Sequence, residues 1–314
     1  MVALVGSLSG IAVAAGVLSL AWMGQEKQRR HLRQTGLAAV RESLACVTAV
    51  QQHRGMSVAL LNGDKAFGPR LSAKQTDVDA ALHALGARID ETPALAVCAP
   101  RRDRITAEWR QLAGRVQDMT PEQSFAAHTG LVQQMLYLLG DLGEQAGLLA
   151  GGDGRRADRD AERRLVQLLL QRLPPLVEHI GQARALGSGF AARGHCGAVG
   201  RIRLRFLAQR IGTGQEALSA LIDMPDWQRS AQAQAAEVAG LLALIDTRLI
   251  GTDRIDLSSA EYFRSATQTI DVCLALWQRV ADEVEGRLAG GVRERTAPAL
   301  SAGLAASAAP VGAT

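Results

Sequence analysis

Residues 37–61 read LAAVRESLACVTAVQQHRGMSVALL, and this stretch decides the fold class. Apolar residues spaced three and four apart lie on one face of an α-helix. Heptad steps along the stretch give a nearly continuous apolar seam at Leu37, Val40, Leu44, Val47, Gln51, Arg54, Val58 and Leu61. The following pair, Asn62 and Gly63, is typical of a helix C-cap. We therefore expect a helix over Arg30–Leu61 with one buried face.

The same spacing runs through the rest of the chain, and no alternating strand pattern of useful length interrupts it. Two capping boxes, Thr120 with Gln123 and Ser258 with Glu261, mark the starts of helices. Pro174 and Pro175 predict a bend inside a long helix, because proline cannot donate to the helical ladder. The expected helices cover residues 30–61, 72–89, 102–116, 121–151, 159–193, 199–222, 226–250 and 259 onward.

The chain has 314 residues, enough for two domains, and its aromatic content of 4% favours helices over a β-sheet. The stretch GGDGRRAD at residues 151–158 is the most linker-like one. We expect an all-α fold of two side-by-side four-helix bundles after an N-terminal transmembrane helix. The expected divisions are 1–24 as the anchor, 25–150 as the first bundle, 151–290 as the second bundle and 291–314 as a disordered tail rich in Ala, Gly, Ser and Pro.

Residues Val2–Met23 carry no charged side chain, and as a helix they would extend for about 33 Å, enough to cross a bilayer core. A cleaved signal peptide is the alternative, although no basic residue precedes the apolar run. Trp22 fits a membrane interface, and basic residues follow it directly. We therefore expect a single-pass protein of the bacterial inner membrane with its remaining residues in the cytoplasm.

Charge and cysteine spacing exclude several classes of function. Residues 25–34 contribute +3 of the net charge of +4, so the rest of the chain is nearly neutral and nucleic acid is not an expected partner. The four cysteines are far apart and lack the spacing of zinc ligands, so we expect buried thiols and neither metal nor cofactor. Because no catalytic motif occurs either, we do not expect an enzyme.

Arg54 is the one charge in the apolar seam of residues 37–61. A buried guanidinium is costly unless an anion or good acceptors meet it. An internal carboxylate or a seam open to solvent would satisfy it, whereas the neighbouring Gly55 and Ser57 favour a bound ligand, because a small residue allows close approach and a hydroxyl adds a donor.

A weak echo of this pattern lies about 130 residues later, where Arg184 precedes Gly187 and Ser188. If the two bundles pack side by side, Arg54 and Arg184 could share a cleft. Two planar guanidinium groups suit a small planar oxyanion, since each can donate two parallel hydrogen bonds.

These features resemble the nitrate- and nitrite-sensing (NIT) domain family of bacteria. The resemblance rests on residues Val47–Leu82, Ser124–Leu149, Gln182–Ser188 and Tyr262–Asp271. It implies two four-helix bundles with nitrate or nitrite held by arginines on facing helices. The motif arginines carry over to Arg54 and Arg184, and a further family arginine to Arg248. Two positions depart from the family pattern, with His53 in place of the usual Glu and Ala185 in place of a common Gly.

Two functions remain open at this stage. The first is a membrane-tethered sensory module that binds nitrate or nitrite and signals through a partner, because family members usually carry an output module and we expect this one to lie in another protein. The second is a ligand-free helical scaffold of the inner membrane. The expected partners are nitrate or nitrite, the membrane, a signalling protein and a second copy of the chain in a homodimer.

Overall fold

The structure is a computed structural model that describes residues 3–151, 156–222 and 225–290, without the side chains of residues 3–19, 225–226 and 290. Every regular element in these ranges is a helix and none is a strand, which confirms the predicted all-α class. The α-helices are α1 (Ala3–Leu61), α2 (Phe67–Glu91), α3 (Ala99–Arg115), α4 (Pro121–Gln145), α5 (Arg156–Gln167), α6 (Leu173–Arg193), α7 (Ala198–Ser219), α8 (Pro225–Leu244) and α9 (Ser259–Gly290).

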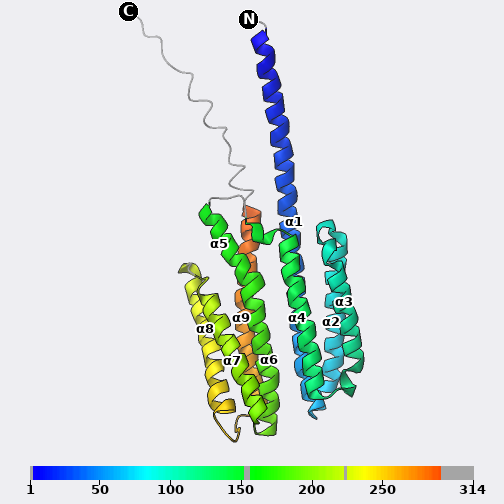
Figure 1. The fold of residues 1–314 in the computed structure, drawn as a ribbon, viewed down its shortest axis with the longest axis vertical. Helices are drawn as coiled ribbons and strands as arrows, with labels where there is room; N and C mark the ends of the chain where they lie inside the picture. Colours follow the sequence, from blue (N-terminus) through cyan, green and yellow to red (C-terminus); the bar gives the residue numbers. More distant parts are fainter. Residues whose placement is uncertain (1–2, 152–155, 223–224, 291–314) are drawn as a thin grey trace, which may run out of the picture.

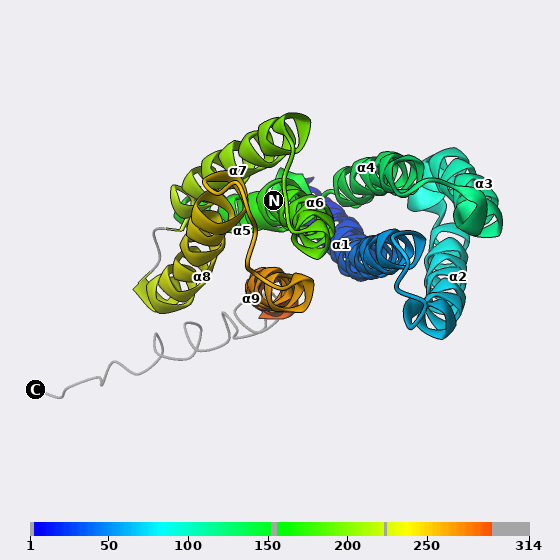
Figure 2. The same cartoon turned by 90° about the horizontal axis from the view of Figure 1, so that it is seen from below.

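The helices pack in two groups that lie side by side along the long axis of the molecule (Figures 1 and 2). In the first group, α1 packs against α2 and α4, and α3 packs against α4. In the second group, α6 packs against α7 and α9, and α8 packs against the same two helices. Helix α1 also contacts α6 and α9, so it belongs to the first group and forms the seam with the second.

Both predicted capping boxes are present. The Thr120 side chain accepts a hydrogen bond from the Gln123 backbone N–H, and the Gln123 side chain accepts one from the Thr120 N–H. Ser258 and Glu261 form the same reciprocal pair at the start of α9. After α1, Gly63 has a φ of 104°, a left-handed conformation that strains residues with a side chain, so the predicted C-cap is also confirmed.

The long helix predicted over residues 159–193 is interrupted by a π-helical turn, Leu168–Arg172, between α5 and α6. The Leu173 N–H donates to the Leu168 carbonyl, five residues back. Pro174 and Pro175 follow directly and have no N–H, so the ordinary hydrogen bonds to residues 170 and 171 are missing. A second π-helical turn, Ile245–Ile250, follows α8. The sequence did not predict it, because no proline lies in or beside this segment.

Helix α1 is a single helix of 59 residues, so the helix expected over residues 30–61 is continuous with the preceding segment. It extends well beyond the other helices at its N-terminal end (Figure 1). Among the described residues, no helix is both long and apolar enough to span a membrane. The predicted span Val2–Met23 falls mostly on residues whose side chains are not described, and the predicted tail 291–314 lies outside the described residues.

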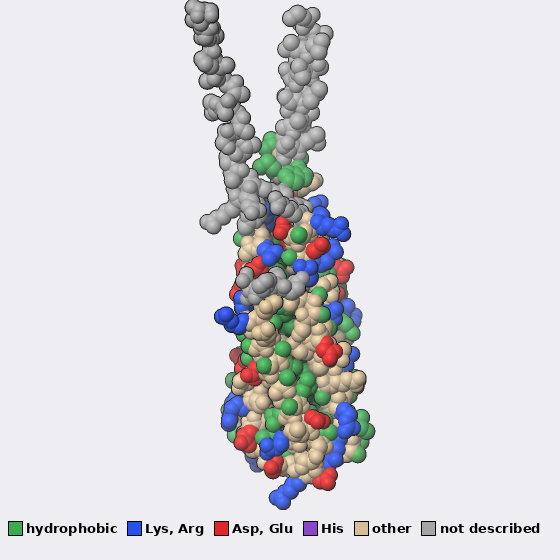
Figure 3. Space-filling view, turned by 90° about the vertical axis from the view of Figure 1, so that its left-hand side faces the viewer, with side chains coloured by type: hydrophobic (Ala, Val, Ile, Leu, Met, Phe, Trp, Pro, Cys, Tyr) green, Lys and Arg blue, Asp and Glu red, His purple; other side chains and the backbone are tan. Residues whose placement is uncertain are grey.

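Ion pairs connect α1 to the second group of helices at several levels. Arg33 pairs with Glu162 of α5. Farther along, Arg41 pairs with Asp282 at 2.8 Å and with Glu285 at 2.9 Å, both on α9. Elsewhere the surface charges are mixed, and on the side where α5 and α8 lie the basic and acidic side chains are interspersed (Figure 3).

One apolar core runs through both groups, and all four cysteines are buried free thiols as predicted. Helices α6 and α9 approach closely at Gly187, where a Cβ atom would lie 2.3 Å from the ring of Tyr262. The Tyr262 side chain is fully buried, and its hydroxyl donates to the Ala183 carbonyl at 2.9 Å. Gly187 therefore leaves the space that this ring occupies, and its part in a ligand site stays a prediction.

We expect Gly187→Ala to lower the free energy of unfolding by about 1–3 kcal/mol, because the buried Tyr262 ring has to move to accept a methyl group. Gly140→Ala on α4 is the matched control. Its Cβ would meet no atom within 4 Å, so the better helix propensity of alanine should leave stability equal or raise it by up to about 1 kcal/mol. Urea unfolding of both variants would contradict the packing assignment if the two lost stability equally.

Candidate ligand site between α1 and α6

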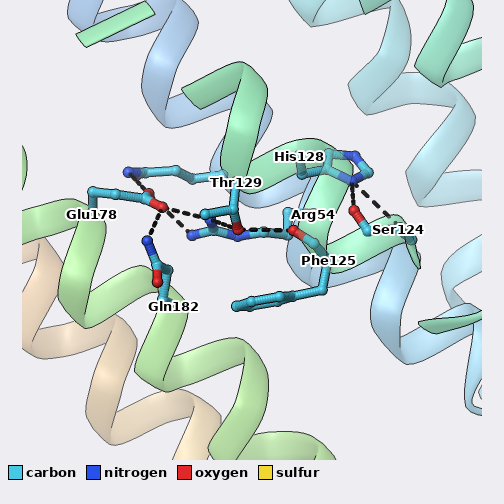
Figure 4. Close-up of polar contacts among 8 residues, drawn as sticks. Arg54, Ser124, Phe125, His128, Thr129, Glu178 and Gln182 are labelled. Atoms are coloured by element: carbon cyan, nitrogen blue, oxygen red, sulfur yellow. Dashed lines mark hydrogen bonds and ion pairs between the residues drawn. The ribbon is translucent and has the colours of Figure 1, made fainter. Parts of the chain in front are cut away.

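Arg54 lies on α1 and is 0% exposed, directly at the seam between the two helix groups. Its Nη1 donates to Glu178 Oε1 of α6 at 2.7 Å and its Nη2 donates to Glu178 Oε2 at 3.1 Å. On the other side, Nη1 donates to Thr129 Oγ1 of α4 at 3.1 Å, and the ring of Phe125 lies 5.5 Å from the guanidinium carbon (Figure 4). One side chain therefore joins three helices.

Glu178 is fully engaged by its neighbours. Besides Arg54, Gln51 donates to Oε2 and Gln182 donates to Oε1, each at 2.7 Å. The backbone of α6 comes close to the arginine, since a Cβ on Gly181 would lie 3.0 Å from Arg54 Nη2. Of the alternatives that the sequence left open, an internal carboxylate is the one that meets Arg54.

Arg184 on α6 is the second buried arginine, 5% exposed. Its Nη1 donates to Thr267 Oγ1 at 3.0 Å, and its guanidinium carbon lies 4.9 Å from the centre of the Phe263 ring. No carboxylate among the described residues forms an ion pair with it, and its Nε has no hydrogen-bond partner there. Burial, and next the charge of Arg54, lowers the pKa of Arg184 to about 10, so it stays positive at neutral pH.

The structure brings some of the other predicted residues to this seam and not others. Gly55 and Ser188 line a cavity of about 680 Å³ between α1, α2, α6 and α9. Ser57 points away, because its Oγ donates to the His53 carbonyl of its own helix at 2.7 Å. Arg248 lies in the π-helical turn after α8 and pairs with Asp256 at 2.8 Å, with 45% of its side chain exposed. The structure therefore does not bring it to this seam, and its role in binding stays a prediction from the resemblance.

A pair of buried histidines lies beside Arg54 in the first helix group. His128 Nδ1 is 2.7 Å from the Ser124 carbonyl and must donate to it, so its Nε2 accepts from His53 Nδ1 at 2.8 Å. The remaining nitrogen, His53 Nε2, is buried without a partner among the described residues. Burial lowers the pKa of His53 to about 4, and burial together with His53 lowers that of His128 to about 3, so both rings are neutral at pH 7.

The sequence did not reveal the residues that complete the site. Glu178 and Gln182 are four residues apart on α6 and therefore share one helix face, which was the available signal. Thr129 and Phe125, also four residues apart, form the matching pair on α4. No sequence pattern links these two helices to Arg54, because only the packing of α1 between them does so.

The chain is thus a helical protein with two buried arginines where its two helix groups meet. Arg54 comes from α1 in the first group, and Arg184 comes from α6 in the second. The chain belongs to the NIT family, described as nitrate and nitrite sensing, whose model matches residues 45–285. The chain is also similar to a solved structure described as the NasR transcription antiterminator. The TM-score is 0.63 at 22% identity, covering 88% of this chain and 77% of that one, which shows a shared fold. No curated protein matches the chain.

We expect Arg54→Ala to lower the free energy of unfolding by about 3–5 kcal/mol, because Glu178 would remain buried without its cation. Arg41→Ala is the matched control, since the partners of Arg41 are exposed and such surface pairs contribute about 0–1 kcal/mol. Chemical unfolding without added nitrate measures both. Equal losses would show that the buried pair has no special role in stability.

The histidine pair predicts a loss of stability in mild acid. Because the folded-state pKa values lie below the ordinary 6.5, the unfolded chain binds more protons as the pH falls below about 6.5, and the stability present above that pH is lost progressively towards pH 4. We expect a loss on the order of 2 kcal/mol or more between pH 7 and pH 5, measured by urea unfolding. His128→Asn should reduce this slope, whereas His83→Gln, at an exposed position, should not.

Proposed function

We propose that this chain is a non-enzymatic sensory module that binds nitrate or nitrite at the seam between its two helix groups. The observation that carries the proposal is Arg184, a buried cation that forms no ion pair with a carboxylate among the described residues, although the charges of Asp271 and Glu178 act on it. A planar oxyanion would supply an acceptor for its Nε, which has none among the described residues. Membership of the NIT family supports nitrate or nitrite as that oxyanion.

Glu178 gives the proposal a mechanism. Its two oxygens already occupy the planar fork of Arg54, in the manner expected of a bound oxyanion. In our proposal the ligand binds Arg184 first and competes with Glu178 for Arg54. Release of Glu178 would also free Gln51 and Gln182, so the contact between α1 and α6 would differ between the free and bound states.

Helix α1 is the element suited to carry this change. It contains Arg54 and continues without interruption to Ala3. We infer that residues Val2–Met23 anchor the chain in the bacterial inner membrane, with the other residues in the cytoplasm. The exposed Leu20, Trp22 and Met23 and the basic residues after them support this inference. The output would then lie in a signalling partner, with homodimerisation as one means of coupling.

A ligand-free scaffold is the second candidate, and one observation favours it. The charge of Arg54 is already balanced by Glu178, so the centre of the seam is stable without a ligand. In that case the helical faces would serve protein contacts alone.

The two candidates differ in their response to nitrate. We expect millimolar sodium nitrate to raise the melting temperature of the full-length protein relative to equal sodium chloride, because a ligand that binds only the folded state stabilises it. Arg184→Met, which keeps an apolar stem but no charge, should abolish the shift. Arg184→Lys should restore little of it, because an ammonium lacks the planar fork. A wild-type protein indifferent to nitrate and nitrite would favour the scaffold.

A further inference from the structure

The cavity beside Arg184 is much larger than a nitrate ion requires. Its volume of about 680 Å³ is in the range of sites for organic molecules. Its lining is mostly apolar by exposed area, with Val58 of α1, Phe67 of α2 and Phe263 of α9, and it includes small residues of α6 such as Ala185 and Gly189. Nitrate has no apolar part, so it would leave most of this surface without a partner.

The charges around the cavity favour an anion at its inner end. Asp64, Arg70, Arg264 and Asp271 line it, but all four are exposed, so solvent screens them and their formal charges cancel. Arg184 is different because it is buried directly behind the wall, in contact with Phe263 and Thr267. A buried charge acts more strongly than an exposed one, so Arg184 favours an anion on its side of the cavity, where the charges of Asp271 and Glu178 offset part of its effect.

Two hydroxyl groups at the cavity wall can donate to such an anion. Ser188 Oγ is buried and has no hydrogen-bond partner among the described residues. Thr267 Oγ1 accepts from Arg184 at 3.0 Å, which leaves its own proton free to donate. The two side chains come from α6 and α9, and both line the cavity.

From this combination we propose that the cavity binds an organic monocarboxylate with an apolar body. The carboxylate accepts from Ser188 and Thr267 near Arg184, and the apolar body contacts Phe263, Phe67 and Val58. The volume suits a ligand of roughly six to fifteen carbon atoms. This inference goes beyond the proposed function, because it names a different class of ligand. Of the residues predicted for the nitrate site, it shares Arg184, Gly55 and Ser188.

The test is calorimetric titration of the full-length protein with sodium 4-phenylbutyrate and with sodium acetate at constant sodium chloride. Each buried methylene strengthens binding roughly fourfold, so we expect phenylbutyrate to bind at least tenfold more tightly than acetate. Equal affinities, or no binding of phenylbutyrate, would overturn the inference.

Cavity-filling variants locate the site. Ala59→Leu on α1 and Ala192→Leu on α6 each place a larger side chain in the lining and should weaken phenylbutyrate binding at least tenfold. Ala84→Leu, at an exposed position of α2 outside the lining, is the matched control and should bind normally. Circular dichroism identifies any variant that does not fold. Unchanged binding by both folded filling variants would overturn the inference.

Nitrate titrations of the same proteins separate this inference from the proposed function. If the filling variants lose phenylbutyrate and keep the nitrate response, both proposals are supported. If phenylbutyrate binds in the cavity while nitrate has no effect on the wild type, the inference stands and the nitrate proposal fails. If nitrate stabilises the wild type but phenylbutyrate does not bind, the nitrate proposal stands and this inference fails.

Discussion

The rest of the structure depends on the ion pair between Arg54 and Glu178. It is buried, so it must be complete, and completing it requires side chains from α1, α4 and α6 at once. The pair therefore fixes the position of α6, and with it the second helix group, along the length of α1. The more exposed pairs of Arg33 and Arg41 lie along the same helix and add to that register rather than set it.

The two buried arginines at this seam differ in how their charges are balanced. Arg54 has a carboxylate and two glutamines arranged about it, whereas Arg184 has a hydroxyl, an aromatic ring and a neighbouring cavity. One arginine is thus built into the fold and the other is left with capacity for an external anion. The two neutral histidines beside Arg54 fit this arrangement, because a protonated ring there would add a further buried positive charge.

Local sequence signals predicted the helices well and the site only in part. The capping boxes and the proline-associated interruption near Pro174 depend on neighbouring residues, so the sequence contains them directly. The buried Arg54 was also visible, because a charge interrupted an apolar seam. Its partner Glu178 was not, since it is 124 residues away and only tertiary packing brings it there. For Arg248, likewise, no local pattern distinguishes a surface arginine from one at a seam, and the structure places this one at the surface.

Glu178 also has a consequence for sensitivity. Any anion that binds Arg54 has to compete with this carboxylate. Because Glu178 belongs to the same chain, its effective concentration at Arg54 is fixed by the fold and does not fall when the protein is diluted. The apparent dissociation constant is then the intrinsic one divided by the fraction of molecules in which Arg54 is free. Gln51 and Gln182 hold Glu178 in place through their hydrogen bonds, so they contribute to that fraction. The concentration at which such a protein responds can therefore be tuned, over many generations, by substitutions at these two glutamines, with both arginines unchanged.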